Sequence, residues 1–312
     1  MKELAEKILE GDRRAAARAI SMVENNDPDK QEFLSHIYPY TGKAHIIGIT
    51  GAPGSGKSTL ADRLIDYYRK KEQQVGVIAV DPTSPFTGGA ILGDRIRMQE
   101  HALDPGVFIR SMGSRGSLGG LSRATREAVT ILDAMGRDVI MVETVGVGQS
   151  EVDIVKMADT TLVVLTPAGG DSVQTLKAGI MEIADIFVVN KADLEGADRT
   201  IREVNMMLDL GQAKGWRPPV VATKTLKNEG LEDLYATVGE HHTYLKAEGR
   251  LQEFRKRRAR LEILELVENK IKDRVWEQVH DEKYFDKLLE QILKKTLDPY
   301  SAADQILENI KL

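Results

Sequence analysis

Cysteine is absent from this 312-residue sequence, which excludes a disulfide framework, a Cys-ligated metal site and a cysteine nucleophile. A chain without cysteine fits a reducing compartment, so we expect a cytoplasmic protein. No apolar run approaches the roughly 18 residues that a transmembrane helix needs. Residues 1–7 form an amphipathic pattern rather than the apolar region of a signal peptide. We therefore expect a soluble chain with no membrane partner.

The chain also lacks an excess of basic residues. Asp and Glu outnumber Lys and Arg by 48 to 43, and the formal net charge is -5. This balance argues against nucleic acid as a partner. The basic segment 255–260 is either a nucleic-acid patch or the solvated face of a long helix. Glu253, Glu262 and Glu265 balance its charge, which favours the solvated face.

Between residues 45 and 224 the sequence alternates between short apolar segments and amphipathic helices. Runs such as 139–142 and 162–165 are continuously apolar, as in strands that are buried on both faces of a parallel sheet. The carboxyl ends of such strands are where ligands usually bind. The predicted strands are His45–Thr50, Val75–Asp81, Val107–Ser111, Asp138–Glu143, Thr161–Thr166, Ile186–Asn190 and Val220–Thr223.

Helical patterns flank this α/β region on both sides. The sequence predicts an N-terminal helical extension over residues 1–42, a nucleotide-binding domain over residues 43–228 and a C-terminal helical region over residues 229–312. In the last region, Asp298 and Pro299 form a turn and a helix start. The helices predicted there are 231–246, 250–274, 281–295 and 299–309.

Residues 51–58 read Gly-Ala-Pro-Gly-Ser-Gly-Lys-Ser, which is a complete phosphate-binding loop between an apolar strand and a helix. The glycines allow backbone N–H groups to turn toward phosphates, and the helix N-terminus adds a favourable dipole. We expect Lys57 to stabilise the β- and γ-phosphates, Ser58 to bind magnesium and Thr59 to contact the α-phosphate. The predicted phosphate-binding residues are Gly51, Ala52, Pro53, Gly54, Ser55, Gly56, Lys57, Ser58 and Thr59. The fold class is therefore α/β, with a mostly parallel sheet of the P-loop nucleoside triphosphatase type.

A second motif, Asn190-Lys191-Ala192-Asp193, follows a predicted strand and indicates guanine. The carboxylate of Asp193 can accept hydrogen bonds from both N1–H and N2–H of guanine, and adenine has no matching donors. Asn190 and Lys191 complete the predicted base site. Ala222 and Thr223, which follow the last predicted strand together with Lys224, are weaker candidates for closing over the base.

Glu143 ends another predicted strand and begins the segment Glu143-Thr-Val-Gly146. We expect its carboxylate to reach the magnesium shell and the N–H of Gly146 to meet the γ-phosphate. Val147 follows this glycine, where Ras-like proteins carry the glutamine that orients water. The sequence therefore predicts slow intrinsic GTP hydrolysis that a partner accelerates.

Two further carboxylates complete a predicted oxygen shell for Mg²⁺ with Ser58 and Glu143. Asp81 ends a predicted strand on the phosphate side. Asp94 lies in the following polar loop, where it is either a magnesium ligand or the cap of the helix that begins with Arg95.

Taken together, these segments resemble the MeaB/ArgK family of P-loop GTPases, which includes the animal methylmalonic aciduria type A protein. The resemblance covers nearly the whole chain. The most specific matches are Gly93-Asp-Arg-Ile-Arg-Met98 and Glu143-Thr-Val-Gly-Val-Gly-Gln-Ser150. One departure is Arg115, in a segment where some members have Pro-Ser-Pro-Ser-Ser-Gly, and its role stays open.

The resemblance implies a homodimeric GTPase that binds GTP, GDP and Mg²⁺ and is a chaperone of an adenosylcobalamin-dependent acyl-CoA mutase, most often methylmalonyl-CoA mutase. Such a chaperone gates cofactor loading and protects the mutase. The resemblance also implies a third switch over residues 169–177, with Asp171, Gln174 and Lys177 facing a partner. From the residues alone, a solvent-facing ion pair on a helix is the favoured interpretation of this trio.

Two other functions compete with this one. A metal-insertion GTPase of the HypB/UreG type would need a cluster of His or Cys ligands, and this chain offers the single pair His241-His242. A small-molecule kinase would need an acceptor pocket and a phosphorylated product. The guanine motif at Asn190–Asp193 argues against the kinase.

Overall fold

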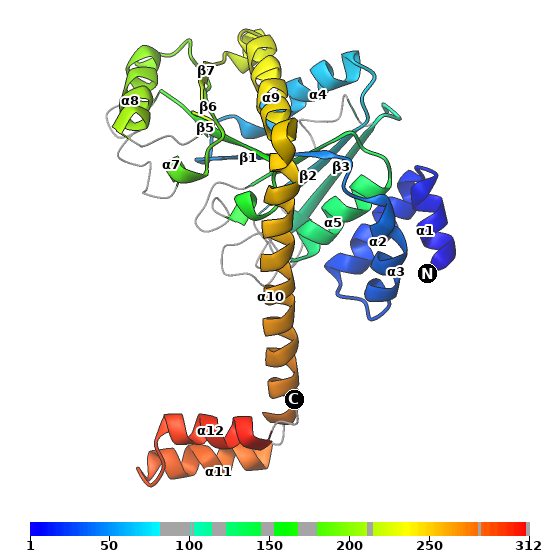
Figure 1. Ribbon diagram of the computed structural model, residues 1–312, viewed down its shortest axis with the longest axis vertical. Coiled ribbons are helices and arrows are strands. Elements are labelled where there is room, and N and C mark those ends of the chain that lie inside the picture. Colours follow the sequence, from blue (N-terminus) through cyan, green and yellow to red (C-terminus); the bar gives the residue numbers. More distant parts are fainter. Residues whose placement is uncertain are drawn as a thin grey trace. The chain divides into compact units, whose positions relative to one another are not determined.

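The computed structural model describes residues 1–81, 101, 103–113, 123–144, 153–167, 180–210, 215–279 and 282–309. It divides the chain into two compact units, Met1–Arg250 and Leu251–Leu312. The first unit holds a sheet with helices on both faces (Figure 1). The second unit is helical throughout its described part.

The sheet is seven-stranded, and every neighbouring pair of strands is parallel. The strand order is β3-β2-β4-β1-β5-β6-β7. The predicted α/β class and each predicted strand are confirmed, with small shifts at the strand ends. The strands are β1 (His45–Gly51), β2 (Val75–Asp81), β3 (Val107–Gly113), β4 (Val139–Glu143), β5 (Thr160–Leu165), β6 (Ile186–Val189) and β7 (Val220–Ala222).

Both faces of the sheet are covered because successive strand residues point to opposite sides. On β2, Val75 and Val77 pack with α4 (Lys57–Lys70) and α9 (Leu231–Lys246) in one core. Ile78 and Val80 pack with α5 (Arg123–Ala134) and the N-terminal helices in another. This arrangement explains the continuous apolar runs of the strands. The described helices of this unit are α1 (Lys2–Leu9), α2 (Arg13–Glu24), α3 (Lys30–Ile37), α4 (Lys57–Lys70), α5 (Arg123–Ala134), α7 (Ile180–Ile183), α8 (Ala197–Leu210) and α9 (Leu231–Lys246).

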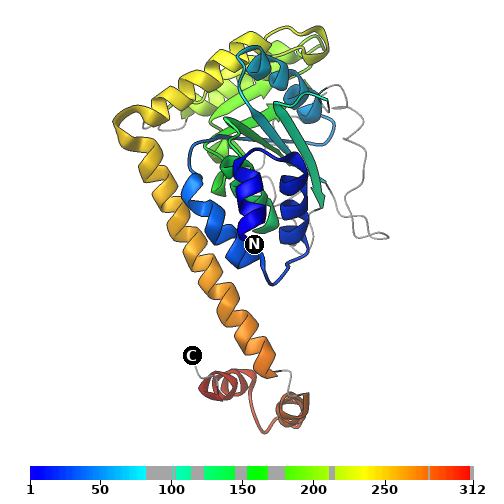
Figure 2. The ribbon, with the colours of Figure 1, turned by 90° about the vertical axis from the view of Figure 1, so that its right-hand side faces the viewer.

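The N-terminal extension is built into the first unit through α5 (Figure 2). Lys30 on α3 forms a buried ion pair of 3.0 Å with Glu127 on α5, and Arg123 donates to the same carboxylate at 2.8 Å. Asp133, also on α5, accepts the backbone N–H groups of residues 42–44 just before β1. These contacts join α1–α3 to the sheet by specific polar bonds as well as by apolar packing.

The boundary of the C-terminal region differs from the predicted one at residues 228 and 229. Leu231, Leu234 and Val238 of α9 are buried in the same core as Leu60 of α4. Residues 229–250 therefore belong to the first unit, because their apolar stripe is used by the sheet. A helical pattern predicts the helix but not the surface that it covers.

The second unit contains most of α10 (Arg250–Val279), followed by α11 (Glu282–Leu293) and α12 (Pro299–Asn309). Asp298 caps α12 by accepting the N–H groups of Tyr300 and Ser301, as the predicted helix start requires. Large apolar side chains on α10 are at least 39% exposed, namely Leu261, Ile263, Leu264, Val267 and Ile271. No helix in the described ranges combines the length and apolar character needed to cross a bilayer.

Candidate functional site

The phosphate-binding loop connects β1 to α4 at the carboxyl edge of the sheet. Gly51, Gly54 and Gly56 have φ values of 143°, 76° and 91°, in the region that favours glycine. A side chain at Gly51 would also collide with the backbone oxygen of Val164 on β5, and one at Gly56 with the side chain of Asn190. Glycine is thus favoured at all three positions by backbone conformation, and at Gly51 and Gly56 also by close packing.

Lys57 is the cation of this loop, and it is 6% exposed. Its Nζ donates hydrogen bonds to the carbonyl oxygens of Gly51 at 2.8 Å and Ala52 at 3.1 Å. Ser55 is 1% exposed, and its hydroxyl has no hydrogen-bond partner within the described ranges. Buried polar groups normally have partners. A phosphate oxygen would give Ser55 this partner, so the loop fits a polyphosphate.

Ser58 and Glu143 meet beside the loop. Ser58 Oγ donates to Glu143 Oε1 at 2.6 Å, and both residues are buried. The sheet brings them together, since Glu143 at the end of β4 pairs in register with Ile49 on β1. A hydroxyl and a carboxylate are oxygen ligands of the kind that Mg²⁺ prefers. Asp81 ends β2 on the same edge of the sheet.

The remaining predicted residues are absent from the described part of the chain. Asp94, Arg115 and Gly146 lie outside the described residues, and so does the predicted third switch with Asp171, Gln174 and Lys177. The backbone of Asp81 is described, whereas its side chain is not.

Asn190 joins the two predicted motifs. Its Nδ2 donates a hydrogen bond of 2.8 Å to the carbonyl oxygen of Ser55 in the phosphate-binding loop. Its Oδ1 accepts hydrogen bonds from the hydroxyls of Thr223 and Thr225 at 3.2 and 2.5 Å. All four residues are at most 3% exposed. Asn190 is therefore a buried connector between the two motifs.

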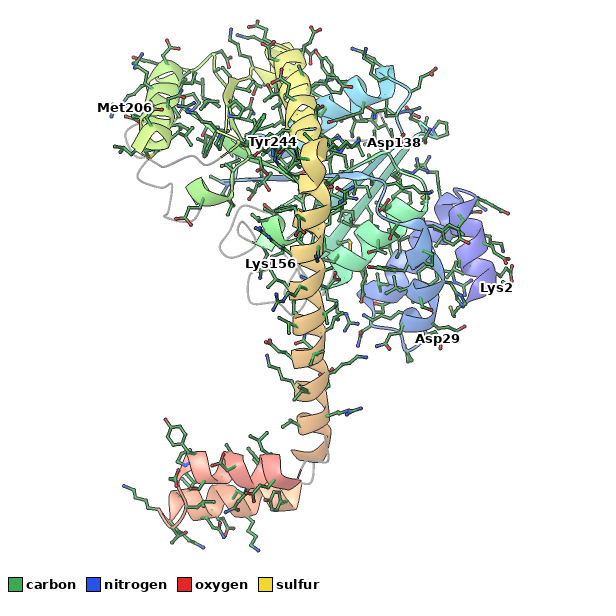
Figure 3. All side chains as sticks on the ribbon, in the orientation of Figure 1. Lys2, Asp29, Asp138, Lys156, Met206 and Tyr244 are labelled. Carbon is green, nitrogen blue, oxygen red and sulfur yellow. The ribbon has the colours of Figure 1, made fainter. Side chains whose placement is uncertain are left out.

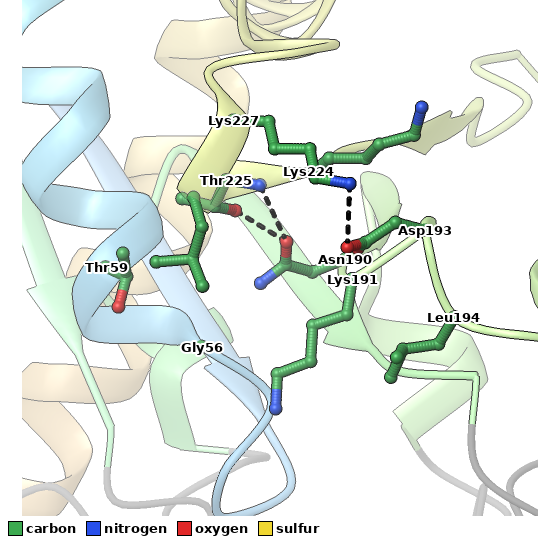
Figure 4. Close-up of a pocket in the computed structure, with 10 residues that line it drawn as sticks. Gly56, Thr59, Asn190, Lys191, Asp193, Leu194, Lys224, Thr225 and Lys227 are labelled. Atoms are coloured by element: carbon green, nitrogen blue, oxygen red, sulfur yellow. Dashed lines mark hydrogen bonds and ion pairs between the residues drawn. The ribbon is translucent and has the colours of Figure 1, made fainter.

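A pocket of about 370 Å³ opens beside this connector (Figure 4). Lys191 extends along it and donates to the carbonyl oxygen of Gly54 at 2.9 Å, so its aliphatic stem forms part of the wall. Asp193 supplies the carboxylate. The residues that line the pocket are Gly56, Thr59, Asn190, Lys191, Asp193, Leu194, Lys224, Thr225, Leu226 and Lys227.

The carboxylate of Asp193 is ionised and partly solvated, at 39% exposure of its side chain. A hydrogen bond from its own backbone and the ammonium of Lys227 hold the pKa of Asp193 below its ordinary value. Lys227 Nζ lies 3.3 Å from Asp193 Oδ2. An ionised carboxylate that lines a pocket suits a ligand edge with two adjacent N–H donors.

The turn after β7 supplies residues that the sequence did not single out. Thr225, Leu226 and Lys227 form a 3-10 turn that lines the pocket. Of the predicted trio after the last strand, Lys224 lines the pocket, whereas Thr223 contributes by bonding Asn190 and Ala222 is not part of the lining. No motif marks the Thr-Leu-Lys turn; only its position after the last strand could have drawn attention to it.

A second polar cluster lies at the opposite, amino ends of the strands. His241 on α9 is 2% exposed. Its Nδ1 lies 2.9 Å from the hydroxyl of Thr160, and its Nε2 lies 3.4 Å from Asp185 Oδ1. The Thr160 hydroxyl also lies 2.8 Å from His45 Nε2. Trp216 and Tyr244 pack around His241 (Tyr244 is labelled in Figure 3).

Burial governs the charges of this cluster. Burial lowers the pKa of His241 to about 4 and raises the pKa of Asp185 to about 7. His241 is therefore neutral at neutral pH. Within the described ranges, no group of three or more His, Asp or Glu side chains is arranged to hold a metal ion. The cluster is thus a structural contact between α9 and the sheet.

Comparison with known proteins identifies a matching family model, related proteins and a similar solved structure. The family model described as "Methylmalonyl Co-A mutase-associated GTPase MeaB" matches residues 16–280. A protein of Pyrococcus abyssi described as a GTPase is 56% identical over 99% of this chain and 96% of its own length. The mouse "Methylmalonic aciduria type A homolog, mitochondrial" is 31% identical over 97% of this chain and 78% of its own length. A crystal structure titled "LAO/AO transport system kinase" has a TM-score of 0.75 at 28% identity, covering 99% of this chain and 97% of that one.

Proposed function

This chain belongs to the MeaB family of methylmalonyl-CoA mutase-associated GTPases, and from that premise we propose that its pocket binds the guanine base of GTP and GDP. The observation that supports this most is the direct bond from Asn190 to Ser55, which joins the base pocket to the phosphate-binding loop. Asp193 would accept the two N–H donors of guanine. Calorimetry with GDP and ADP tests the proposal, since GDP should bind at least a hundredfold more tightly. Equal affinities would refute it.

Hydrolysis of GTP would depend on residues of the same loop. Lys57 would leave the carbonyls of Gly51 and Ala52 and neutralise the β- and γ-phosphates. Ser58 and Glu143 would hold Mg²⁺ together with Asp81 and Asp94. When bound, the metal supplies electrostatic stabilisation of charge on the phosphates. Chelation with EDTA should therefore abolish turnover and restored Mg²⁺ should recover it.

We propose that intrinsic hydrolysis is slow. The support is the sequence after Gly146, where Val147 replaces a glutamine that would orient water. Single-turnover measurements with and without a partner protein test this. Turnover by the isolated protein that no partner increases would contradict it.

The partner that we propose is an adenosylcobalamin-dependent acyl-CoA mutase, either methylmalonyl-CoA mutase or a close relative. The description of the family and the name of the mouse relative support a mutase. The protein would gate cofactor loading and protect the mutase in the cytoplasm. Three segments, 82–97, 143–150 and 169–177, would be switches that carry the nucleotide state to the partner. A switch requires different mutase affinities with GDP and with a nonhydrolysable GTP analogue, and equal affinities would refute the role.

We also infer a homodimer through the second unit. Four exposed apolar side chains of α10 recur at helical spacing, namely Leu261, Leu264, Val267 and Ile271. Burying these side chains against a second copy would remove them from water. Light scattering should give a dimer for the unaltered chain and a monomer for Leu264→Glu, with Glu262→Gln on the same helix as the control.

Two other functions have weaker support. A metal-insertion GTPase would need ligands, and the described residues hold no such cluster; stoichiometric Ni²⁺ binding would favour it nevertheless. A small-molecule kinase would release a phosphorylated product instead of free phosphate. Measuring both products from GTP separates the kinase from the hydrolase.

A further inference from the structure

A cation stands directly beside the carboxylate that would hold guanine. Lys227 Nζ lies 3.3 Å from Asp193 Oδ2, and both residues line the pocket (Figure 4). The side chains are 56% and 39% exposed. An ion pair this exposed contributes little to stability. The fold therefore does not require Lys227 at this position, and a role toward the ligand explains it better.

The pocket has a second lysine whose ammonium is directed elsewhere. Lys224 Nζ forms an ion pair of 2.5 Å with Glu229, and the backbones of these two residues are also paired. Figure 4 shows the ammonium of Lys224 turned away from Asp193, whereas that of Lys227 reaches it. The two lysines carry the same charge on the same wall, but only Lys227 faces the predicted base-binding carboxylate.

Asp193 and Lys227 together present two acceptors followed by a donor. Guanine presents the complementary edge, with donors at N2 and N1 followed by the acceptor O6. Adenine presents an amino group in place of O6 and an acceptor at N1. A cation next to the carboxylate would thus meet an acceptor in guanine and a donor in adenine, so it would favour the first and repel the second.

We propose that Lys227 is a specificity-determining residue. When nucleotide binds, Lys227 releases Asp193, which then accepts the two N–H donors of guanine, and Lys227 itself donates a hydrogen bond to the purine O6. This inference rests on the proposed guanine-binding function and adds the group that reads O6. Lys227 then acts in two ways. Without nucleotide it pairs with Asp193, and with nucleotide it distinguishes the carbonyl of guanine from the amino group of adenine.

A thermodynamic cycle tests the O6 contact in the full-length chain. Its two changes are Lys227→Met and replacement of GDP by 6-thio-GDP, in which sulfur is a weak acceptor at position 6. By calorimetry, the unaltered protein should bind GDP about tenfold more tightly than 6-thio-GDP, because a hydrogen bond to a charged donor is lost. Lys227→Met should bind the two nucleotides with equal affinity. It should also discriminate less strongly against ADP.

Lys71→Met is the control, because it removes the same charge at an exposed site beyond the end of α4 and outside the pocket lining. It should keep the full preference for GDP over 6-thio-GDP, and Lys227→Arg should restore that preference. The same thio effect in the unaltered protein and in Lys227→Met would overturn the proposal. Tighter GDP binding by Lys227→Met would also overturn it, because the ammonium would then only compete for Asp193. If the unaltered protein bound ADP as tightly as GDP, the guanine function itself would fail, which is a different result.

Discussion

The side-chain amide of Asn190 donates a hydrogen bond of 2.8 Å to the carbonyl oxygen of Ser55, a residue 135 positions earlier in the chain. This bond crosses from the end of β6 to the phosphate-binding loop. It makes the base pocket and the phosphate site one connected structure. A substitution at Asn190 should therefore affect the binding of both the base and the phosphates of a nucleotide.

We therefore expect Asn190→Ala to weaken GDP binding by about tenfold or more and to lower the free energy of unfolding by about 1–3 kcal/mol. The carbonyl of Ser55 and the hydroxyl of Thr225 would lose a buried partner. Calorimetry and urea unfolding measure the two effects. Asn205→Ala on α8, whose side-chain amide bonds to Ile201 and Arg217 and lines neither the pocket nor the loop, is the control and should leave GDP binding unchanged. Unchanged GDP affinity in Asn190→Ala would contradict the connecting role.

Lys57→Ala should reduce GTP turnover by about a hundredfold or more, because it removes the principal cation from the phosphate loop. Its ammonium is buried among the loop carbonyls, so no neighbouring side chain replaces it easily. Phosphate release under saturating GTP measures the effect. Lys71→Ala, beyond the far end of α4 and exposed, should turn over normally. If both variants retained full activity, Lys57 would not be catalytic.

Asp193→Asn should exchange the base preference of the pocket. The amide would offer a donor where guanine also has a donor, whereas xanthine has a carbonyl at this position. We expect GDP affinity to fall by about a hundredfold and affinity for xanthosine diphosphate to rise, since a mismatched polar pair is left unbonded. Competition binding with the two nucleotides checks this. A variant that keeps its preference for GDP would remove Asp193 from the base site.

The cluster of His241 and Asp185 predicts an unusual dependence of stability on pH. The pKa of His241 falls from 6.5 to about 4 on folding, so its contribution is lost as pH falls through this window. The pKa of Asp185 rises from 3.8 to about 7, so its contribution is lost as pH rises. The two effects oppose each other between roughly pH 4 and 6.5, and the unaltered protein should change little in stability there.

Each of two single variants should show one of these opposing pH effects by itself. In Asp185→Asn, stability should increase with pH across the window by up to about 3 kcal/mol, from the histidine alone. In His241→Gln, stability should decrease with rising pH. Urea unfolding followed by the fluorescence of Trp216, which packs on His241, measures both slopes. His36→Gln, at an exposed site on α3, should behave as the unaltered protein. Two parallel profiles for Asp185→Asn and His241→Gln would disprove the opposition.

Local patterns in the sequence were sufficient for much of the fold. Continuous apolar runs such as 139–142 identify buried strands, because a strand covered on both faces has no polar side. The glycines and Lys57 identify a phosphate loop for a similar reason, since their spacing is imposed by backbone geometry within one turn. The same holds for Asp298 at the start of α12, where a side chain caps the adjacent backbone.

Contacts between residues that are far apart in the sequence could not be predicted from such local patterns. Asn190 reads as a member of a base motif, and only the sheet order brings it under the phosphate loop. Lys227 belongs to a turn with no motif, and it faces Asp193 because β7 lies next to β6. The burial of His241 has no local signal either, since it depends on α9 covering the amino ends of the strands.

The sequence by itself determined the parallel α/β core, the phosphate-binding loop and the family to which the chain belongs. The tertiary structure decided that α9 is part of the core, that Asn190 is a buried connector and that Lys227 stands beside Asp193. The physical reason is the range of the interactions. Strand burial, glycine conformation and helix capping act over a few neighbouring residues, whereas these three contacts depend on strand order and register, which the whole chain sets together.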